Sequence, residues 1–323
     1  MVNKVTFENK PWLSPHEVDR KFNERREKLP KQIEEYILSN PLFKSEDVSV
    51  YFFQTSVSSL VCLLRGETKK LVLKIPLSLT HAPGEGLFFK VWEKAGVKVP
   101  HVFEEGVIGD GPYLLMEFID ADTLSAAEGK GFILKNKEEK LGRILRMMHV
   151  PLGHGYGRCL EGHGEHQTFV GWLEGEEMAK KISYIKEHDL IGDECGELSK
   201  IIKILADHTK AIGHTSYCHD DYGGSNIFAT DPPTVFDPVP RFNDGYIDLG
   251  KVMFGHMLFG GTDETRKEFL KGYFGDEKYD HRVLQAATVL AAYMKFSYWH
   301  RSKKEELMKR GIENLIRDKH LLD

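Results

Sequence analysis

Hydrophobic residues between Val48 and Ile119 fall into short runs separated by polar and turn residues. The runs SVYFFQ, SSLVCLLRG, KKLVLKIP, VPHVFEEGVI and PYLLMEFI are rich in β-branched and aromatic residues, as strands are. Helical spacing interrupts them at 87–95, where LFFKVWEKA is followed by a glycine. This part is therefore expected to form an antiparallel sheet with one helix. The polar segment 1–45 before it is expected to contain a helix with Pro30 in its first turn.

After Asp120 the spacing of apolar residues becomes predominantly helical. EEKLGRILRMMH places its apolar residues on one side of a helix. Further helical stretches are expected at 168–187, 198–212, 264–273 and 283–299. A Gly/His-rich stretch, 151–166, is expected to be a loop, and 214–249 a compact region of loops and strands. The layout predicts an α+β fold of two lobes, 1–118 and 119–323, with a small molecule bound between them.

Composition narrows the class of partner. The chain has 323 residues, too many for one small core, and its 41% hydrophobic and 29% charged content is ordinary for a folded, soluble protein. A net charge of −5 argues against a nucleic-acid partner; it fits a cationic small molecule, and equally simple solubility. The four cysteines form no CxxC pair, and no apolar run has the length of a signal or membrane segment. A cytoplasmic protein without a membrane partner is expected.

The stretch CHDDYGGSNIF at 218–228, followed by VFD at 235–237, carries the candidate chemistry. Phosphoryl transfer needs a carboxylate that orients the attacking hydroxyl, and oxygen ligands that hold Mg²⁺ against the phosphates. Asp221 can be the carboxylate, and a hairpin would bring Asn226 and Asp237 beside it as metal ligands. The catalytic loop of protein kinases spaces its Asp and Asn in the same way. The alternative is a polar turn between two strands, because short motifs recur by chance.

Two upstream residues favour the kinase interpretation. Lys74 ends the run LVLK, and Glu85 opens the next helical segment. A lysine in this place can reach the α- and β-phosphates of ATP, and a glutamate can hold it there by ion pairing. Either residue alone is most often a surface charge. Their order ahead of the catalytic stretch is what favours function.

Other polar residues are expected to have supporting roles. His219 is expected to brace the loop rather than transfer protons. Asp220 is secondary because adjacent residues point apart, and Asp248 is expected to cap or brace the helix that follows it. A zinc site in the Gly/His-rich stretch is disfavoured because the spacing matches no metal pattern. Its ligands would be His154, Cys159, His163 and His166.

From about residue 52 to residue 255 the chain resembles the aminoglycoside phosphotransferase and choline-kinase group of kinase-like enzymes. The resemblance is carried by VPHVFEEGVIGDGPYLLMEFIDADTL, LGRILRMMH and CHDDYGGSNIF, the last close to the catalytic loop of hygromycin phosphotransferases. It implies a two-lobed, protein-kinase-like fold with an antiparallel-sheet N-lobe that binds nucleotide and a mainly helical C-lobe. It also implies Asp221 as the catalytic base or the group that orients the hydroxyl, Asn226 and Asp237 as magnesium ligands, and Lys74 with Glu85 as the pair on the phosphate side.

The resemblance further implies how ATP, or GTP in its place, is held. The backbone of Glu117 and Ile119 would hydrogen-bond the adenine, and Ser58 and Ser59 would lie in the turn that covers the phosphates. That turn lacks a GxGxxG motif, as it often does in antibiotic and metabolite kinases of this group. A proline follows Asp237, where many relatives have an aromatic residue and fructosamine kinases have proline.

The predicted function is ATP- and Mg²⁺-dependent phosphorylation of a hydroxyl group on a small cationic molecule. An aminoglycoside antibiotic is the first choice of substrate. One alternative is a metabolite kinase of the same fold, acting on a fructosamine, choline or a methylthio-sugar. Another is a kinase-like module that binds nucleotide without catalysis. Substrate choice in such a fold lies in variable loops of the second lobe, so these alternatives stay open.

Overall fold

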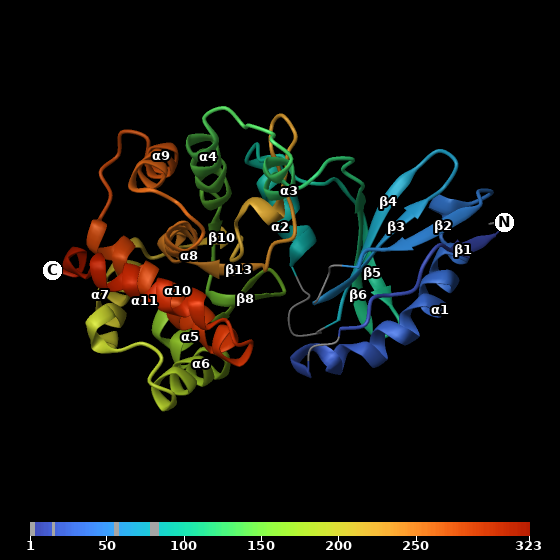
Figure 1. The fold of residues 1–323 in the computed structure, drawn as a ribbon. Coiled ribbons are helices and arrows are strands. Elements are labelled where there is room, and N and C mark those ends of the chain that lie inside the picture. Colours follow the sequence, from blue (N-terminus) through green and yellow to red (C-terminus); the bar gives the residue numbers. More distant parts are fainter. Residues whose placement is uncertain (1–3, 15–16, 55–57, 78–83) are drawn as a thin grey trace. The chain divides into compact units, whose positions relative to one another are not determined.

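The computed structural model describes residues 4–14, 17–54, 58–77 and 84–323. The chain divides into two compact units, Met1–Lys90 with Val99–Ala121 and Val91–Lys98 with Asp122–Asp323. Figure 1 shows sheet strands dominating the first unit and helices the second. None of the described helices is both long enough and apolar enough to cross a membrane.

The first unit is built on a six-stranded sheet in the order β1-β2-β3-β4-β6-β5. Among the described strands of this sheet, β1 and β2 pair in parallel, and the other neighbours are antiparallel, as expected for the central strands. The strands are β1 Val5–Phe7, β2 Val48–Phe52, β3 Ser59–Arg65, β4 Lys70–Pro76, β5 Val102–Ile108 and β6 Gly111–Glu117. Helix α2, Glu85–Lys94, follows β4 in the chain.

Helix α1, Asn23–Ser39, starts earlier than the sequence predicts. Pro30 lies inside the helix rather than in its first turn, so that prediction was wrong. Proline lacks an N–H and normally interrupts a helix. Here Leu29, Ile33 and Ile37 lie on both sides of it and are buried with the sheet residues of the same core. That burial offsets the cost of the missing hydrogen bond.

The second unit contains a five-stranded sheet in the order β7-β10-β13-β8-β9 and the two-stranded hairpin β11-β12. The strands are β7 Leu152–Gly153, β8 Tyr156–Leu160, β9 His163–His166, β10 Thr215–Cys218, β11 Ile227–Phe228, β12 Thr234–Val235 and β13 Arg241–Asn243. The stretch 151–166, expected to be a loop, therefore contributes three short strands. Tyr156 and Cys159 are buried there, and Gly155 and Gly157 take positive φ values of 75° and 91° that allow the tight turns.

Nine helices surround these strands in the described part of the second unit, besides the end of α2 (Figure 1). They are α3 Leu124–Gly129, α4 Lys137–His149, α5 Phe169–Glu174, α6 Glu176–Glu187, α7 Leu198–Ile212, α8 Gly245–Leu258, α9 Asp263–Phe274, α10 His281–Arg301 and α11 Glu305–Arg317. Helix α10 is buried around most of its circumference, as a helix at the centre of a core must be. It packs closely on α8, where a Cβ added to Gly250 would lie 2.5 Å from the carbonyl carbon of Ala287.

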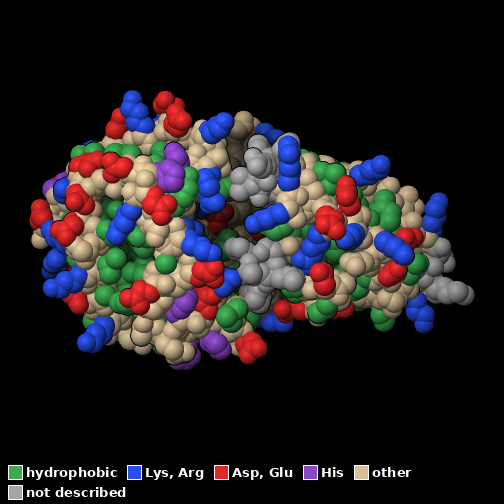
Figure 2. Space-filling view, turned by 90° about the horizontal axis from the view of Figure 1, so that it is seen from below, with side chains coloured by type: hydrophobic (Ala, Val, Ile, Leu, Met, Phe, Trp, Pro, Cys, Tyr) green, Lys and Arg blue, Asp and Glu red, His purple; other side chains and the backbone are tan. Residues whose placement is uncertain are grey.

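Surface charge is mixed on the described parts of both units. Figure 2 shows Lys and Arg side chains interspersed with Asp and Glu on the visible face of each unit. On this face, therefore, neither sign of charge dominates.

Candidate active site

The loop that follows β10 is anchored by the buried carboxylate of Asp248. Asp248, in the first turns of α8, accepts hydrogen bonds from the backbone N–H groups of His219 (2.7 Å) and Asp220 (2.9 Å). His149 on α4 lies 3.2 Å from the same carboxylate. Burial alone would raise the pKa of Asp248, but the contact with His149 and the nearby Lys251 outweigh it and lower the pKa. The loop backbone is thus anchored to an ionised group in the core.

This role differs from the one expected for Asp248. The cap of α8 is Asp244, which accepts a hydrogen bond from the N–H of Tyr246 at 2.8 Å. Asp248 braces the loop that precedes its helix in the chain, across 29 residues, instead of the helix that follows it. The sequence YIDLG did not reveal that Asp248 bonds to this loop, because no residue near Asp248 in the chain indicates a contact so distant in sequence.

His219 braces the loop from within, as predicted. Its side chain is fully buried, and its Nε2 lies 3.0 Å from the carbonyl oxygen of Phe236. Its Nδ1 accepts from the N–H of Asp221 at 3.3 Å, so Nε2 carries the proton and donates to Phe236. Burial lowers the pKa of His219, which keeps the ring neutral. Trp92 stacks on the ring with centroids 5.9 Å apart.

Asp221 lies at the exposed end of this braced loop, with half of its side-chain surface accessible. The side-chain nitrogen of Asn226 donates to the backbone carbonyl of Asp221 at 2.8 Å and to its carboxylate Oδ2 at 3.0 Å. The ammonium group of Lys295 on α10 lies 3.1 Å from the other carboxylate oxygen, Oδ1. Burial favours the neutral acid, but Lys295 outweighs it and the pKa of Asp221 is lowered. Asp221 is therefore an accessible carboxylate with both oxygens oriented.

The expected hairpin is present. Strands β11 and β12 pair in antiparallel register, with Ile227 opposite Val235. The N–H of Phe236 donates to the carbonyl of Asn226 at 3.0 Å, which extends the pairing by one residue. Asp237, exposed and with φ of 53°, follows at the same end of the hairpin as Asn226. The amide nitrogen of Asn226 donates to Asp221, which leaves its amide oxygen as an oxygen donor of the kind that Mg²⁺ prefers, as is the Asp237 carboxylate.

Lys74 and Glu85 form the predicted pair in the first unit. The Lys74 ammonium, on β4, lies 2.6 Å from the Glu85 carboxylate at the start of α2. Both side chains are more than nine-tenths buried. A pair this buried is costly to desolvate, so it is weak evidence for stability and stronger evidence for a functional role.

The residues expected to contact the nucleotide lie in the same unit. Glu117 ends β6, and its N–H donates to the carbonyl of His101 at 2.8 Å. Ile119 lies just beyond, and its carbonyl accepts from the N–H of Ala121 at 2.9 Å. Ser59 is the buried first residue of β3 rather than a turn residue, because it pairs with Pro76 across the sheet. Ser58 precedes it and is exposed, and 55–57 of the expected turn lie outside the described residues.

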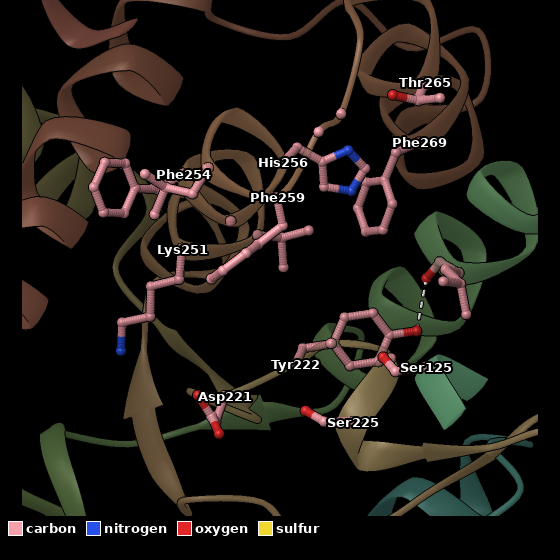
Figure 3. A pocket seen from close by; sticks show the side chains of 18 of the residues that line it. Ser125, Asp221, Tyr222, Ser225, Lys251, Phe254, His256, Phe259, Thr265 and Phe269 are labelled. Atoms are coloured by element: carbon pink, nitrogen blue, oxygen red, sulfur yellow. Dashed lines mark hydrogen bonds between the residues drawn. The ribbon is translucent and has the colours of Figure 1, made fainter. Parts of the chain in front are cut away.

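A cavity of about 670 Å³ opens beside the loop that carries Asp221, within the second unit. In Figure 3, Asp221, Tyr222 and Ser225 line one side, and Phe259, His256 and Phe269 lie across from them. Tyr222 is fixed by a hydrogen bond of 3.0 Å from its hydroxyl to the carbonyl of Leu141. The lining of the cavity combines aromatic side chains with carboxylates and lysines, which is the composition of a small-molecule site.

A series of linked charged side chains, buried or half-buried, supports the loop, and the sequence did not predict it. Asp220 has a left-handed φ of 66° and pairs with Lys251 of α8 and, at 3.2 Å, with Arg241 of β13. Arg241 in turn contacts Glu177 of α6 at 2.9 and 3.0 Å. Asp220 therefore has a structural role that differs from the role of Asp221. The sequence predicted this difference, because the side chains of adjacent residues point apart.

This chain of charges predicts acid sensitivity. Burial favours neutral Glu177, but Arg241 and then Lys181 outweigh it and hold the pKa of Glu177 at about 2. Because the folded pKa lies below its ordinary value of 4.5, the stabilisation is complete above that value and is lost as pH falls towards 2. We expect Glu177→Gln to destabilise the protein at pH 7 and to flatten the dependence of unfolding free energy on pH between about 5 and 2.

Urea unfolding at a series of pH values measures this effect. The matched control is Glu176→Gln, the neighbouring carboxylate, whose pair with Lys180 is exposed. An equal loss of stability from both variants, or none from Glu177→Gln, would show that the pair of Glu177 with Arg241 does not cause the acid sensitivity.

One further group of potential metal ligands lies beneath the loop that carries Asp221. Within the described residues, ligand atoms of His149, Cys218 and Asp248 lie within 4.8 Å of one another, whereas those of the Gly/His-rich stretch form no such group. Burial raises the pKa of the Cys218 thiol well above its usual range, and the Asp248 oxygens already accept backbone hydrogen bonds. This trio is therefore part of the loop support and not a zinc site.

The same fold occurs in solved phosphotransferases. A thermostable variant of aminoglycoside phosphotransferase APH(4)-Ia, in complex with AMP-PNP and hygromycin B, matches with a TM-score of 0.65 at 12% identity, over 89% of this chain and 98% of that one. A protein assigned as a fructosamine-3-kinase from Haemophilus somnus 129PT matches with a TM-score of 0.54 at 17% identity, over 82% and 88%. The chain has the two-lobed, kinase-like α+β fold that these proteins share, and the resemblance predicted from sequence is confirmed.

A curated relative comes from Staphylococcus aureus (strain NCTC 8325 / PS 47) and is named as a ketoamine kinase. It is 24% identical over 198 residues, which is 56% of this chain and 63% of the relative. The match thus spans less than two thirds of the relative's length. No protein-family profile matches the chain.

Proposed function

We propose that this protein transfers the γ-phosphoryl group of ATP to a hydroxyl group of a small molecule. The observation that carries the proposal is the contact between Asp221 and Asn226 on an exposed, internally braced loop that lines a cavity. In this arrangement Asp221 accepts a hydrogen bond from the acceptor hydroxyl and takes its proton as the phosphoryl group is transferred. Positioning and charge neutralisation supply most of the rate, without a covalent intermediate.

Asn226 and Asp237 are proposed to hold Mg²⁺, which would neutralise the charge of the nucleotide phosphates when bound. The 1–118 lobe is proposed to bind the nucleotide, and the 119–323 lobe to carry catalysis and acceptor binding. The Glu117 carbonyl and the Ile119 N–H are the backbone groups proposed for adenine. This assignment is supported by the AMP-PNP and ADP named in complexes of APH(4)-Ia.

Lys74 is proposed to bind the α- and β-phosphates of the nucleotide, with Glu85 holding its ammonium group in place. We expect Lys74→Met to lower kcat/KM for ATP by about 10²-fold, because a preorganised positive charge is lost from the phosphates. The matched control is Lys90→Met on α2, which breaks an exposed pair with Glu105 and should leave kcat/KM unchanged. An equal change in kcat/KM for ATP from the two variants would show that Lys74 has no special role in binding the phosphates.

A ketoamine, the adduct of a sugar with an amine, is at least as well supported as an aminoglycoside for the acceptor. The curated relative is named as a ketoamine kinase, and two structural neighbours are assigned as fructosamine-3-kinases. An aminoglycoside is supported by the higher TM-score with APH(4)-Ia. Both molecules carry hydroxyl and amino groups, so the predicted cationic, hydroxylated substrate is common to the two proposals.

The test is acceptor-dependent ATP consumption with Mg²⁺ over a panel of ketoamines, free sugars, amines and aminoglycosides. Turnover on ketoamines alone would support the metabolite kinase, and turnover on aminoglycosides alone the resistance kinase. Nucleotide binding without transfer to any member of a broad panel would favour the non-catalytic module instead.

A further inference from the structure

Two lysines from neighbouring helices reach the two consecutive aspartates of the catalytic loop. Lys251 of α8 pairs with Asp220, and Lys295 of α10 pairs with Asp221. The close packing of α8 on α10 at Gly250 brings both helices to the loop. Lys295 lines the cavity together with Ala291 and Trp299 of the same helix, and it is the charged residue among these three.

The two pairs differ in their surroundings. Lys251 and Asp220 retain only 6% and 11% of their side-chain exposure, and Arg241 also contacts Asp220. Lys295 and Asp221 retain 38% and 51%. A buried, multiply connected pair holds structure, whereas a pair this exposed adds little to stability. Stability therefore does not account for Lys295.

The geometry at Asp221 indicates what Lys295 does there. Lys295 lies 3.1 Å from Oδ1, and Asn226 donates to Oδ2 at 3.0 Å. Two partners on different oxygens fix both the rotamer and the plane of the carboxylate, which neither could do alone. The remaining lone pairs then face a defined direction, and a reacting hydroxyl requires that direction to be held closely.

We propose that Lys295 is a positioning residue, which holds the Asp221 carboxylate in the orientation that receives the acceptor hydroxyl. The proposal rests on the function proposed above. Lys295 acts through Asp221 and comes from a helix 74 residues further along the chain, outside the catalytic-loop motif. The other titratable groups that surround the pair are Asp220 and the neutral His219 on the loop and Lys251 and Asp248 on α8. The first three of these have their own partners, and Asp248 is committed to the loop backbone.

The experiment compares Lys295→Met and Lys295→Arg with Lys309→Met, an exposed lysine on α11. We expect Lys295→Met to lower kcat by about 10- to 100-fold, since slight misplacement of a reacting group can cost that much. The KM for ATP and the thermal midpoint should stay unchanged. Lys295→Arg, which keeps the charge, should lie closer to wild type than to Lys295→Met, and Lys309→Met should equal wild type. Wild-type kcat in Lys295→Met, or a loss that arginine does not lessen, would overturn the proposal.

A second measurement needs no substrate. In protein labelled with ¹³C-lysine, the ε-carbon signal of Lys295, assigned by its loss in Lys295→Arg, should shift in Asp221→Asn while that of Lys309 does not. An unmoved Lys295 signal would overturn the pairing itself. Inactive wild-type protein with a shifted Lys295 signal would refute the proposed function while leaving the contact in place, so the two failures can be told apart.

Discussion

Asp221→Asn is expected to lower kcat by about 10²- to 10⁴-fold, the contribution typical of a positioned general base. The amide cannot accept the proton of the acceptor hydroxyl, and it removes the charge that Lys295 contacts at 3.1 Å. Half of the Asp221 side chain is exposed, so the substitution should leave folding intact. Nucleotide affinity should change little, because the groups proposed for ATP are Lys74 and its neighbours.

The measurements are kcat with a saturating acceptor, the dissociation constant for ATP with Mg²⁺, and the thermal midpoint. Asp237→Asn serves as the comparison, since loss of a proposed metal ligand should raise the Mg²⁺ requirement, which Asp221→Asn should not. Near-wild-type kcat in Asp221→Asn would remove Asp221 from the chemistry and with it the central assignment of the loop.

Asp248→Asn is expected to destabilise the protein by roughly 3 kcal/mol, because an amide NH₂ would face one of the two buried N–H donors that the carboxylate now satisfies. Those donors belong to His219 and Asp220, so the loop that carries Asp221 should loosen as well. Turnover should therefore fall even under conditions in which the variant is folded. Urea unfolding together with kcat at low temperature measures both effects.

Asp263→Asn is the matched control for this substitution. Asp263 lies in the first turn of α9, as Asp248 lies near the start of α8, but the Asp263 side chain is 74% exposed. Its loss should leave stability and kcat nearly unchanged. A stable Asp248→Asn protein with normal turnover would show that the loop does not depend on this carboxylate.

The sequence was informative where function depends on residues close together in the chain. Asp221 and Asn226 lie five positions apart and touch, and the hairpin expected from two apolar runs is present. Lys74 in β4 and Glu85 at the start of α2 lie 11 positions apart, and they pair. The strand-rich and helix-rich parts followed from hydrophobic periodicity, which reports burial directly.

The sequence was uninformative where contacts join distant segments. Lys295 is an ordinary lysine in an apolar helix, and only the packing of α10 on α8 brings it to Asp221. The bond from Asp248 back to the loop and the link from Glu177 through Arg241 to Asp220 are of the same kind. Pro30 misled the placement of α1, because tertiary burial outweighed the local cost of proline.

The most direct test of the central claim is analysis of the product. Wild-type protein is incubated with ATP, Mg²⁺ and, separately, a ketoamine and an aminoglycoside, and each acceptor is examined by mass spectrometry and ³¹P NMR, with Asp221→Asn in parallel. The account predicts one acceptor that gains a single phosphoryl group on oxygen with the wild type and none with the variant. Phosphorylation that persists in Asp221→Asn, or no phosphorylated acceptor across the whole panel despite bound ATP, would contradict it.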